Sequence, residues 1–145
     1  MTKKLLLLFA AVTCCSIVNA QTTPACDRSC LEQWVDTYLV AMADADANPE
    51  LFAPDVKFTE DGVRLPFGKE GLWFSASGVG NYKFYVPDTE TQQIAFLGTV
   101  RENGTSGDDG DLVAIALRLQ IRNNRITEIE QIVNRVTSVI SSRGD

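Results

Sequence analysis

The stretch LVAIALRLQIRNNRITEIEQIVNRVT, residues 112–137, places two alternating apolar runs on either side of Asn123-Asn124. Asparagine tolerates positive φ, so a two-residue Asn-Asn turn between such runs is typical of a β-hairpin. We therefore expect two antiparallel strands, one over 112–122 and one over 125–137.

Regular pairing across this turn makes Leu117 face Glu130 and gives the hairpin two faces. One face then carries Val113, Ile115, Leu117, Leu119, Ile121, Ile126, Glu128, Glu130 and Ile132. The other carries Leu112, Ala114, Ala116, Arg118, Gln120, Ile129, Gln131, Val133 and Arg135. The first face is strongly apolar, so we expect it to lie under a helix. An unpaired buried carboxylate is costly, so Glu130 must lie at a wet edge, be paired, or be used in chemistry.

The rest of the chain predicts one α+β domain. Apolar residues recur at helical spacing over 29–45, and strands are expected over 56–60, 79–86 and 92–102. A short second helix is expected to begin at 49–52. The predicted organisation is a signal peptide at 1–20, an N-terminal segment at 21–28, the domain at 29–140 and a disordered tail at 141–145.

The first 20 residues are typical of an export signal. Lys3-Lys4 precedes an apolar run over 5–12, and small residues end at Ala20, which predicts cleavage before Gln21 and a secreted or periplasmic protein. The alternative is a lipoprotein acylated at Cys14 or Cys15. The apolar run is shorter than the roughly 20 residues that a permanent membrane anchor needs.

The net charge indicates which partners are disfavoured, and the cysteines indicate the compartment in which the protein folds. The chain has a net charge of −6, which becomes −8 (11 basic, 19 acidic residues) once Lys3 and Lys4 are removed. This balance disfavours nucleic acid and anionic membrane as partners. Cys26 and Cys30 remain after cleavage and predict a structural disulfide in an oxidising compartment. No cofactor or metal site is expected, and the chain has no histidine for a serine hydrolase of the usual kind.

Two further acids share strand faces with large apolar residues. Glu60 follows Val56 and Phe58 on one face, and Glu102 follows Phe96 and other apolar residues on another. A pocket-lining role is one interpretation. The alternative is a wet strand end or a structural ion pair with Arg101, Arg118 or Arg135.

Several segments together resemble a known family. They include the Cys26–Cys30 region, Phe58-Thr-Glu-Asp-Gly-Val, Gly71-Leu-Trp, Val100-Arg-Glu-Asn-Gly and the hairpin through Arg135. Over residues 26–137 the chain is similar to exported domains related to SnoaL-like, nuclear-transport-factor-2-like (NTF2-like) proteins. The resemblance implies a cone: a curved antiparallel sheet wrapped around N-terminal helices, with a pocket at the open end. Such folds host cyclases, isomerases and non-catalytic binding domains, so the fold does not decide the activity.

Two functions are therefore expected from different classes. One is a cofactor-free lyase, isomerase or cyclase that uses carboxylate acid–base chemistry on a small apolar organic molecule. The other is a non-catalytic domain that binds a ligand or a protein. The candidate catalytic residues are Glu60, Glu130 and Tyr82, and the candidate ligand-binding residues are Trp73, Glu102 and Phe58. Burial is expected to raise the pKa of Glu60 or Glu130 unless an arginine reverses the sign. Core packing is the alternative role for Trp73.

A homodimer is expected to form through the second face of the hairpin. That face has small and apolar residues with few charges, and the superfamily often pairs through its sheet. The contact residues would be Leu112, Ala114, Arg118, Ile129, Gln131 and Val133.

Overall fold

The computed structural model describes residues 25–105 and 109–135. The predicted signal peptide, its cleavage point and the predicted tail lie outside these ranges. The elements are α1 (Arg28–Ala43), β1 (Phe52–Glu60), β2 (Val63–Arg64), α2 (Leu72–Ser75), β3 (Ala76–Asp88), β4 (Gln93–Glu102), β5 (Asp111–Arg122) and β6 (Arg125–Asn134). Within the described ranges, no helix is both long enough and apolar enough to cross a bilayer.

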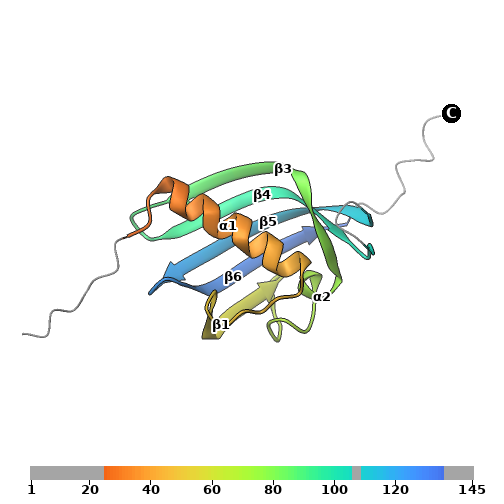
Figure 1. The fold of residues 1–145 in the computed structure, drawn as a ribbon, viewed down its shortest axis with the longest axis horizontal. Helices are drawn as coiled ribbons and strands as arrows, with labels where there is room; N and C mark the ends of the chain where they lie inside the picture. The colour runs from red at the N-terminus through yellow and green to blue at the C-terminus, as the bar shows by residue number, and fades with distance from the viewer. Residues whose placement is uncertain (1–24, 106–108, 136–145) are drawn as a thin grey trace, which may run out of the picture.

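The six strands form one curved sheet in the order β2-β1-β6-β5-β4-β3. Figure 1 shows α1 lying across one face of this sheet. The expected α+β architecture is confirmed, but an entirely antiparallel sheet is not, because β1 and β6 pair in parallel. The short β1–β2 hairpin lies at one edge of the sheet and β3 lies at the other. The second neighbour of β1 is β6, the last strand in the sequence.

Helix α1 begins and ends near its predicted limits. Asp27 caps its N-terminus by accepting a hydrogen bond from the Cys30 amide at 2.9 Å. The buried face carries Leu31, Val35, Tyr38, Leu39 and Met42, each with no exposed surface. On a neighbouring side of the helix, Asp36 accepts hydrogen bonds from Lys83 Nζ at 2.7 Å and Tyr85 Oη at 2.6 Å, which fasten α1 to β3.

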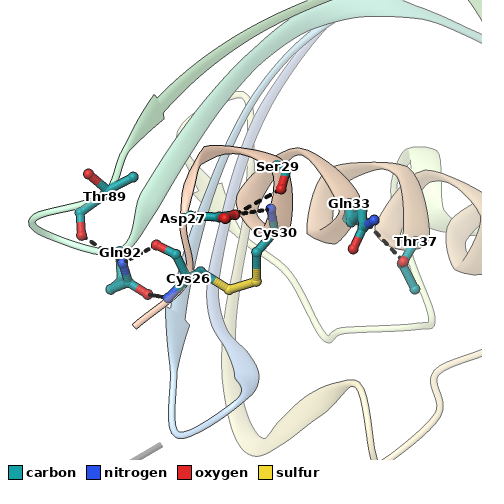
Figure 2. The surroundings of a disulfide bond; sticks show 8 residues. All are labelled: Cys26, Asp27, Ser29, Cys30, Gln33, Thr37, Thr89 and Gln92. Carbon is teal, nitrogen blue, oxygen red and sulfur yellow. Dashed lines mark hydrogen bonds between the residues drawn. A yellow bond between two sulfur atoms is a disulfide. The ribbon is translucent and has the colours of Figure 1, made fainter. Parts of the chain in front are cut away.

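The predicted Cys26–Cys30 disulfide is present, with a Cα–Cα distance of 5.2 Å (Figure 2). The Gln92 side chain holds the same segment from the β3–β4 turn. Its Oε1 accepts from the Cys26 amide at 2.7 Å, and its Nε2 donates to the Cys26 carbonyl at 2.9 Å. The disulfide and this amide clamp together fix the segment before α1 against the sheet.

The β5–β6 hairpin begins with the expected register and then departs from it. Asn123 and Asn124 both have positive φ, at 51° and 57°, and Ile121 pairs with Ile126 as expected. The next pair is Gln120 with Glu128, so Thr127 is an extra residue on β6. This β-bulge turns every later side chain of β6 to the opposite face.

The expected register beyond the bulge is therefore wrong. Arg118, not Leu117, faces Glu130. Ile129, Gln131 and Val133 are buried on the inner face of the sheet, whereas Glu128, Glu130 and Ile132 lie on the outer face. The first three residues consequently cannot form the dimer contact that the sequence suggested.

The core lies between α1 and the inner face of the sheet. Its largest fully buried side chains are Trp73, Tyr38, Phe58, Phe96, Leu31, Leu39, Met42, Leu72, Ile94, Leu119, Ile126 and Ile129. Residues 49–51 form turns and β1 starts at Phe52, so the helix expected to begin there is absent and α2 is the second helix.

Candidate functional site

Glu60 is the centre of a buried polar cluster at the end of β1, where its surface is 7% exposed. Its Oε2 accepts hydrogen bonds from the Leu72 amide at 2.7 Å and from Gln131 Nε2 at 2.8 Å. Gln131 Oε1 in turn accepts from the Tyr38 hydroxyl at 2.8 Å. A continuous chain of hydrogen bonds therefore joins α1, β6, β1 and α2.

The start of α2 can approach Glu60 because residue 71 is glycine. Gly71 has a φ of +70°, in the region that favours glycine. A Cβ at this position would collide with the Glu60 carboxylate.

Glu102, at the end of β4, is the second buried carboxylate and is 4% exposed. Its Oε1 accepts from Arg135 Nε at 2.7 Å, and its Oε2 accepts from the Ser75 hydroxyl at 3.0 Å. Arg135 Nη2 also lies 4.0 Å from Glu60 Oε1. The hydrogen bond to Glu102 raises the pKa of Arg135, so the guanidinium stays charged between the two acids.

Tyr38 contributes a neutral phenol to this cluster. Burial raises its pKa well above the usual value, and the negative charge of Glu60 raises it further. The hydroxyl therefore stays protonated and acts as a donor to Gln131.

An aromatic cluster adjoins the polar one. Trp73 has ring centroids 4.5 Å from Phe67, 5.4 Å from Phe52 and 5.5 Å from Tyr38. Its indole Nε1–H is buried and has no hydrogen-bond partner among residues 25–105 and 109–135. Because a buried unpaired donor is unfavourable, native structures seldom keep one without a reason.

A cleft of about 570 Å³ lies beside this cluster. Phe52 and Phe67, which pack on Trp73, are part of its wall. Its full lining is Ala47, Pro49, Glu50, Phe52, Ala53, Pro54, Val56, Phe67 and Arg125. A Cβ built on Gly68 would lie 3.5 Å from the Ala47 side chain and 3.7 Å from Trp73 Nε1, so the unpaired donor lies close to one wall of the cleft.

The structure brings four of the six candidate site residues together near this end of the sheet. Glu60, Glu102, Phe58 and Trp73 are all buried, and Phe58 stacks edge-on to Phe67 at 5.9 Å. Trp73 packs in the core and is not a rim residue. The functional roles of these residues stay predictions.

Glu130 and Tyr82 lie elsewhere. Glu130 is on the outer face, where Arg118 Nε donates to it at 3.1 Å and Lys57 Nζ lies 3.5 Å away. The hydrogen bond from Arg118 lowers the pKa of Glu130, which is opposite to the rise expected for an acid in the pocket. Tyr82 is exposed on β3. The bulge at Thr127 explains the position of Glu130.

Several contributors to the two clusters, Tyr38 and Ser75 among them, were not among the sequence candidates. Gln131 was assigned to the outer face, and Phe52 and Phe67 were not singled out. The sequence held one sign that Gln131 faces the core. The regular register placed the acids Glu128 and Glu130 on an apolar face, and a shift by one residue would turn Gln131 to that face instead. In the described ranges, no three Cys, His, Asp or Glu side chains are grouped so that they could hold a metal ion.

No protein-family model and no curated protein matches the sequence. Solved structures do match the fold. IdmH of Streptomyces antibioticus, a candidate polyketide cyclase, is 18% identical, with a TM-score of 0.54 over 77% of this chain and 97% of its own. An NTF2-like protein of Burkholderia xenovorans LB400 is 15% identical, with a TM-score of 0.50 over 73% and 90%.

A de novo designed protein with a curved β-sheet matches equally well, at 14% identity and a TM-score of 0.52 over 81% of this chain and 95% of its own. At such identities the likeness concerns the fold. The chain has the α+β, NTF2-like fold that the sequence resemblance implied.

Proposed function

We propose that this NTF2-like domain is an exported protein that binds a small, largely apolar organic molecule in the cleft beside Phe52 and Phe67. The observation that carries the proposal is the aromatic wall of that cleft, where Phe52 and Phe67 pack on the buried Trp73. A volume of about 570 Å³ is ordinary for a small-molecule site, and such sites combine apolar walls with a few polar groups.

The geometry of the acids also favours binding over catalysis. Both oxygens of Glu102 already accept hydrogen bonds, and one oxygen of Glu60 accepts two. Carboxylates held by fixed donors act as structural groups, since a proton-transfer group needs a free oxygen to reach the substrate. Glu102 therefore acts as a structural group, and neither acid is part of the cleft lining.

A screen of aromatic and aliphatic fragments by ¹⁵N–¹H NMR tests the proposal. Bound fragments should shift the amides of residues 47–56 and the Trp73 indole resonance. Phe67→Ala should weaken binding, because it removes one aromatic wall. Leu97→Ala is the matched control, since it removes an apolar side chain from the outer face. Shifts confined to the outer face, or retained in full by Phe67→Ala, would contradict the proposal.

Carboxylate acid–base catalysis on a small apolar substrate is a second candidate, and one observation favours it. Glu60 Oε1 accepts no hydrogen bond within the described part of the chain, and its nearest cation is Arg135 at 4.0 Å. This oxygen could take or give a proton without a cofactor. Once a ligand that turns over is found, Glu60→Gln should abolish turnover and retain binding. Unchanged turnover would exclude Glu60 as the acid or base.

Export is part of the proposal and rests on the leader sequence together with the Cys26–Cys30 disulfide. The intact mass of the purified protein should correspond to a chain that starts at Gln21 and lacks two thiol hydrogens. A retained leader, or two thiols that alkylate without reductant, would refute it.

We also propose a homodimer, now through the corrected outer face. One continuous row of cross-strand neighbours runs over this face from β3 to β6. It consists of Phe84, Leu97, Ala116 and Ile132. Phe84, Leu97 and Ile132 are 51%, 48% and 62% exposed. Exposed apolar patches of this kind often mark interfaces.

The charges of the outer face suit a second copy as the partner. Two cations (Lys57 and Arg118) are paired there with two acids (Glu128 and Glu130). The face therefore carries no net charge from these groups, although the chain is acidic overall. Two copies could approach along it without like-charge repulsion.

A further inference from the structure

Two arginines lie opposite each other at the tip of the β5–β6 hairpin. Arg122 and Arg125 are direct cross-strand partners, and both are exposed. Like charges in this position destabilise a hairpin. Neither guanidinium has a carboxylate within 4.0 Å in the described ranges, although acids outnumber bases in this chain. The pair is thus a local positive site on an acidic protein.

This positive site borders the aromatic cleft. Arg125 is part of the cleft lining, together with Phe52 and Phe67. The strand pairing of Phe52 with Ile126, and the hydrogen bond from the Ile126 amide to the Leu51 carbonyl at 2.9 Å, hold the hairpin tip at this position. The backbone therefore fixes an apolar wall and a cation next to each other.

The chemistry of the lining selects among anions. A guanidinium binds a carboxylate through two parallel hydrogen bonds, and its planar shape suits a flat apolar neighbour. Glu50 is also part of the lining, so the local field is less positive than the arginine pair alone would make it. A group with two negative charges, such as a phosphate, is disfavoured more by Glu50 than a carboxylate with one.

We propose that the cleft binds a small monocarboxylic acid with an aromatic or branched apolar body. The body packs on Phe52 and Phe67, and the carboxylate pairs with Arg125, with Arg122 adding a second positive charge. This inference rests on the proposed function, because it names the ligand class of the same cleft.

The test compares an acid with its neutral counterpart of the same shape. 3-Phenylpropionate and 3-phenylpropionamide are titrated against the exported protein at pH 7, and binding is followed by ¹⁵N–¹H NMR. The acid should bind about tenfold more tightly, as expected when a hydrogen bond gains a charged partner. Arg125→Gln should reduce the affinity for the acid to that for the amide and leave the amide unaffected. Glu50→Gln should strengthen binding of the acid.

Lys57→Gln is the control, because it removes a cation from the outer face and should change neither affinity. Equal affinities for acid and amide, both lowered by Phe67→Ala, would overturn the carboxylate inference and leave the proposed function standing. Acid binding that is unaffected by Arg125→Gln would overturn it as well. If neither probe shifts the cleft resonances at millimolar concentration, this inference fails, whereas the proposed function is judged by the wider fragment screen.

Discussion

Arg135→Gln tests whether the buried acids are structural. Arg135 is the one cation within 4.0 Å of Glu60 or Glu102 in the described ranges, and it donates to Glu102 at 2.7 Å. Removal of one member of a buried ion pair costs about 3–5 kcal/mol, because the remaining charge is left in a poorly solvated site. Side-chain exposure is 6% for Glu102 and 43% for Arg135, so solvent compensates part of this loss.

We therefore expect Arg135→Gln to lower the free energy of unfolding by about 2 kcal/mol at pH 7, below the range for a fully buried pair because solvent reaches the guanidinium. For a domain of this size that corresponds to a fall in melting temperature of about 8 °C. Urea unfolding followed by circular dichroism measures the difference. The double variant Arg135→Gln/Glu102→Gln should recover much of the loss, since it removes the unpaired charge. Arg122→Gln is the matched control and should not lower the stability, because it removes the like-charge contact with Arg125.

A change below about 0.5 kcal/mol for Arg135→Gln would refute the reasoning, because this is what an exposed ion pair contributes. It would mean that water already solvates the two acids. A double variant as unstable as the single one would also contradict it. In either case Glu60 and Glu102 would again be candidates for chemistry.

Three further predictions concern the rest of the fold. Because Arg118 lowers the pKa of Glu130, the stabilisation by this pair is complete above the ordinary carboxyl pKa and is lost as the pH falls through the lowered one. Melts of Glu130→Gln should therefore show a deficit of about 0.5 kcal/mol at pH 7 that disappears in acid, and an increase in stability at pH 7 would contradict the pairing. Gly71→Ala should cost about 1–3 kcal/mol in chemical denaturation, from positive φ and the clash with Glu60, and an unchanged midpoint would be inconsistent with the structure. In light scattering, wild type should have the mass of a dimer and Ile132→Asp that of a monomer, while a monomeric wild type would rule out the outer-face contact.

Local sequence patterns predicted the local elements well. The 3.6-residue spacing of Leu31, Val35, Tyr38 and Met42 determined α1, and Asn123-Asn124 determined the hairpin tip. Which strands become neighbours depends on tertiary packing. The parallel pairing of β1 with β6 joins segments about 70 residues apart, as in Phe58 with Ile129, and no local period encodes it.

The register of β6 was predictable in part. Regular alternation placed Glu128 and Glu130 under α1, and two acids on an apolar face are the mark of a slipped register. Insertion of one residue at Thr127 exchanges them for Ile129 and Gln131, which restores an apolar inner face. The burial of Glu60 and Glu102 needed no such correction, because the pairing is regular from Phe58 to Glu60 on β1 and from Phe96 to Glu102 on β4.

The parallel pairing of β1 and β6 also affects the order in which the chain can fold. β6 comes last in the sequence, yet it lies between β1 and β5 in the sheet. In a ribosome-bound chain that lacks β6, no strand pairing joins the β1–β2 hairpin to the β3–β5 part of the sheet. Contacts between distant segments form slowly, because loop closure must precede them. The sheet therefore cannot be completed until the last strand has been synthesised.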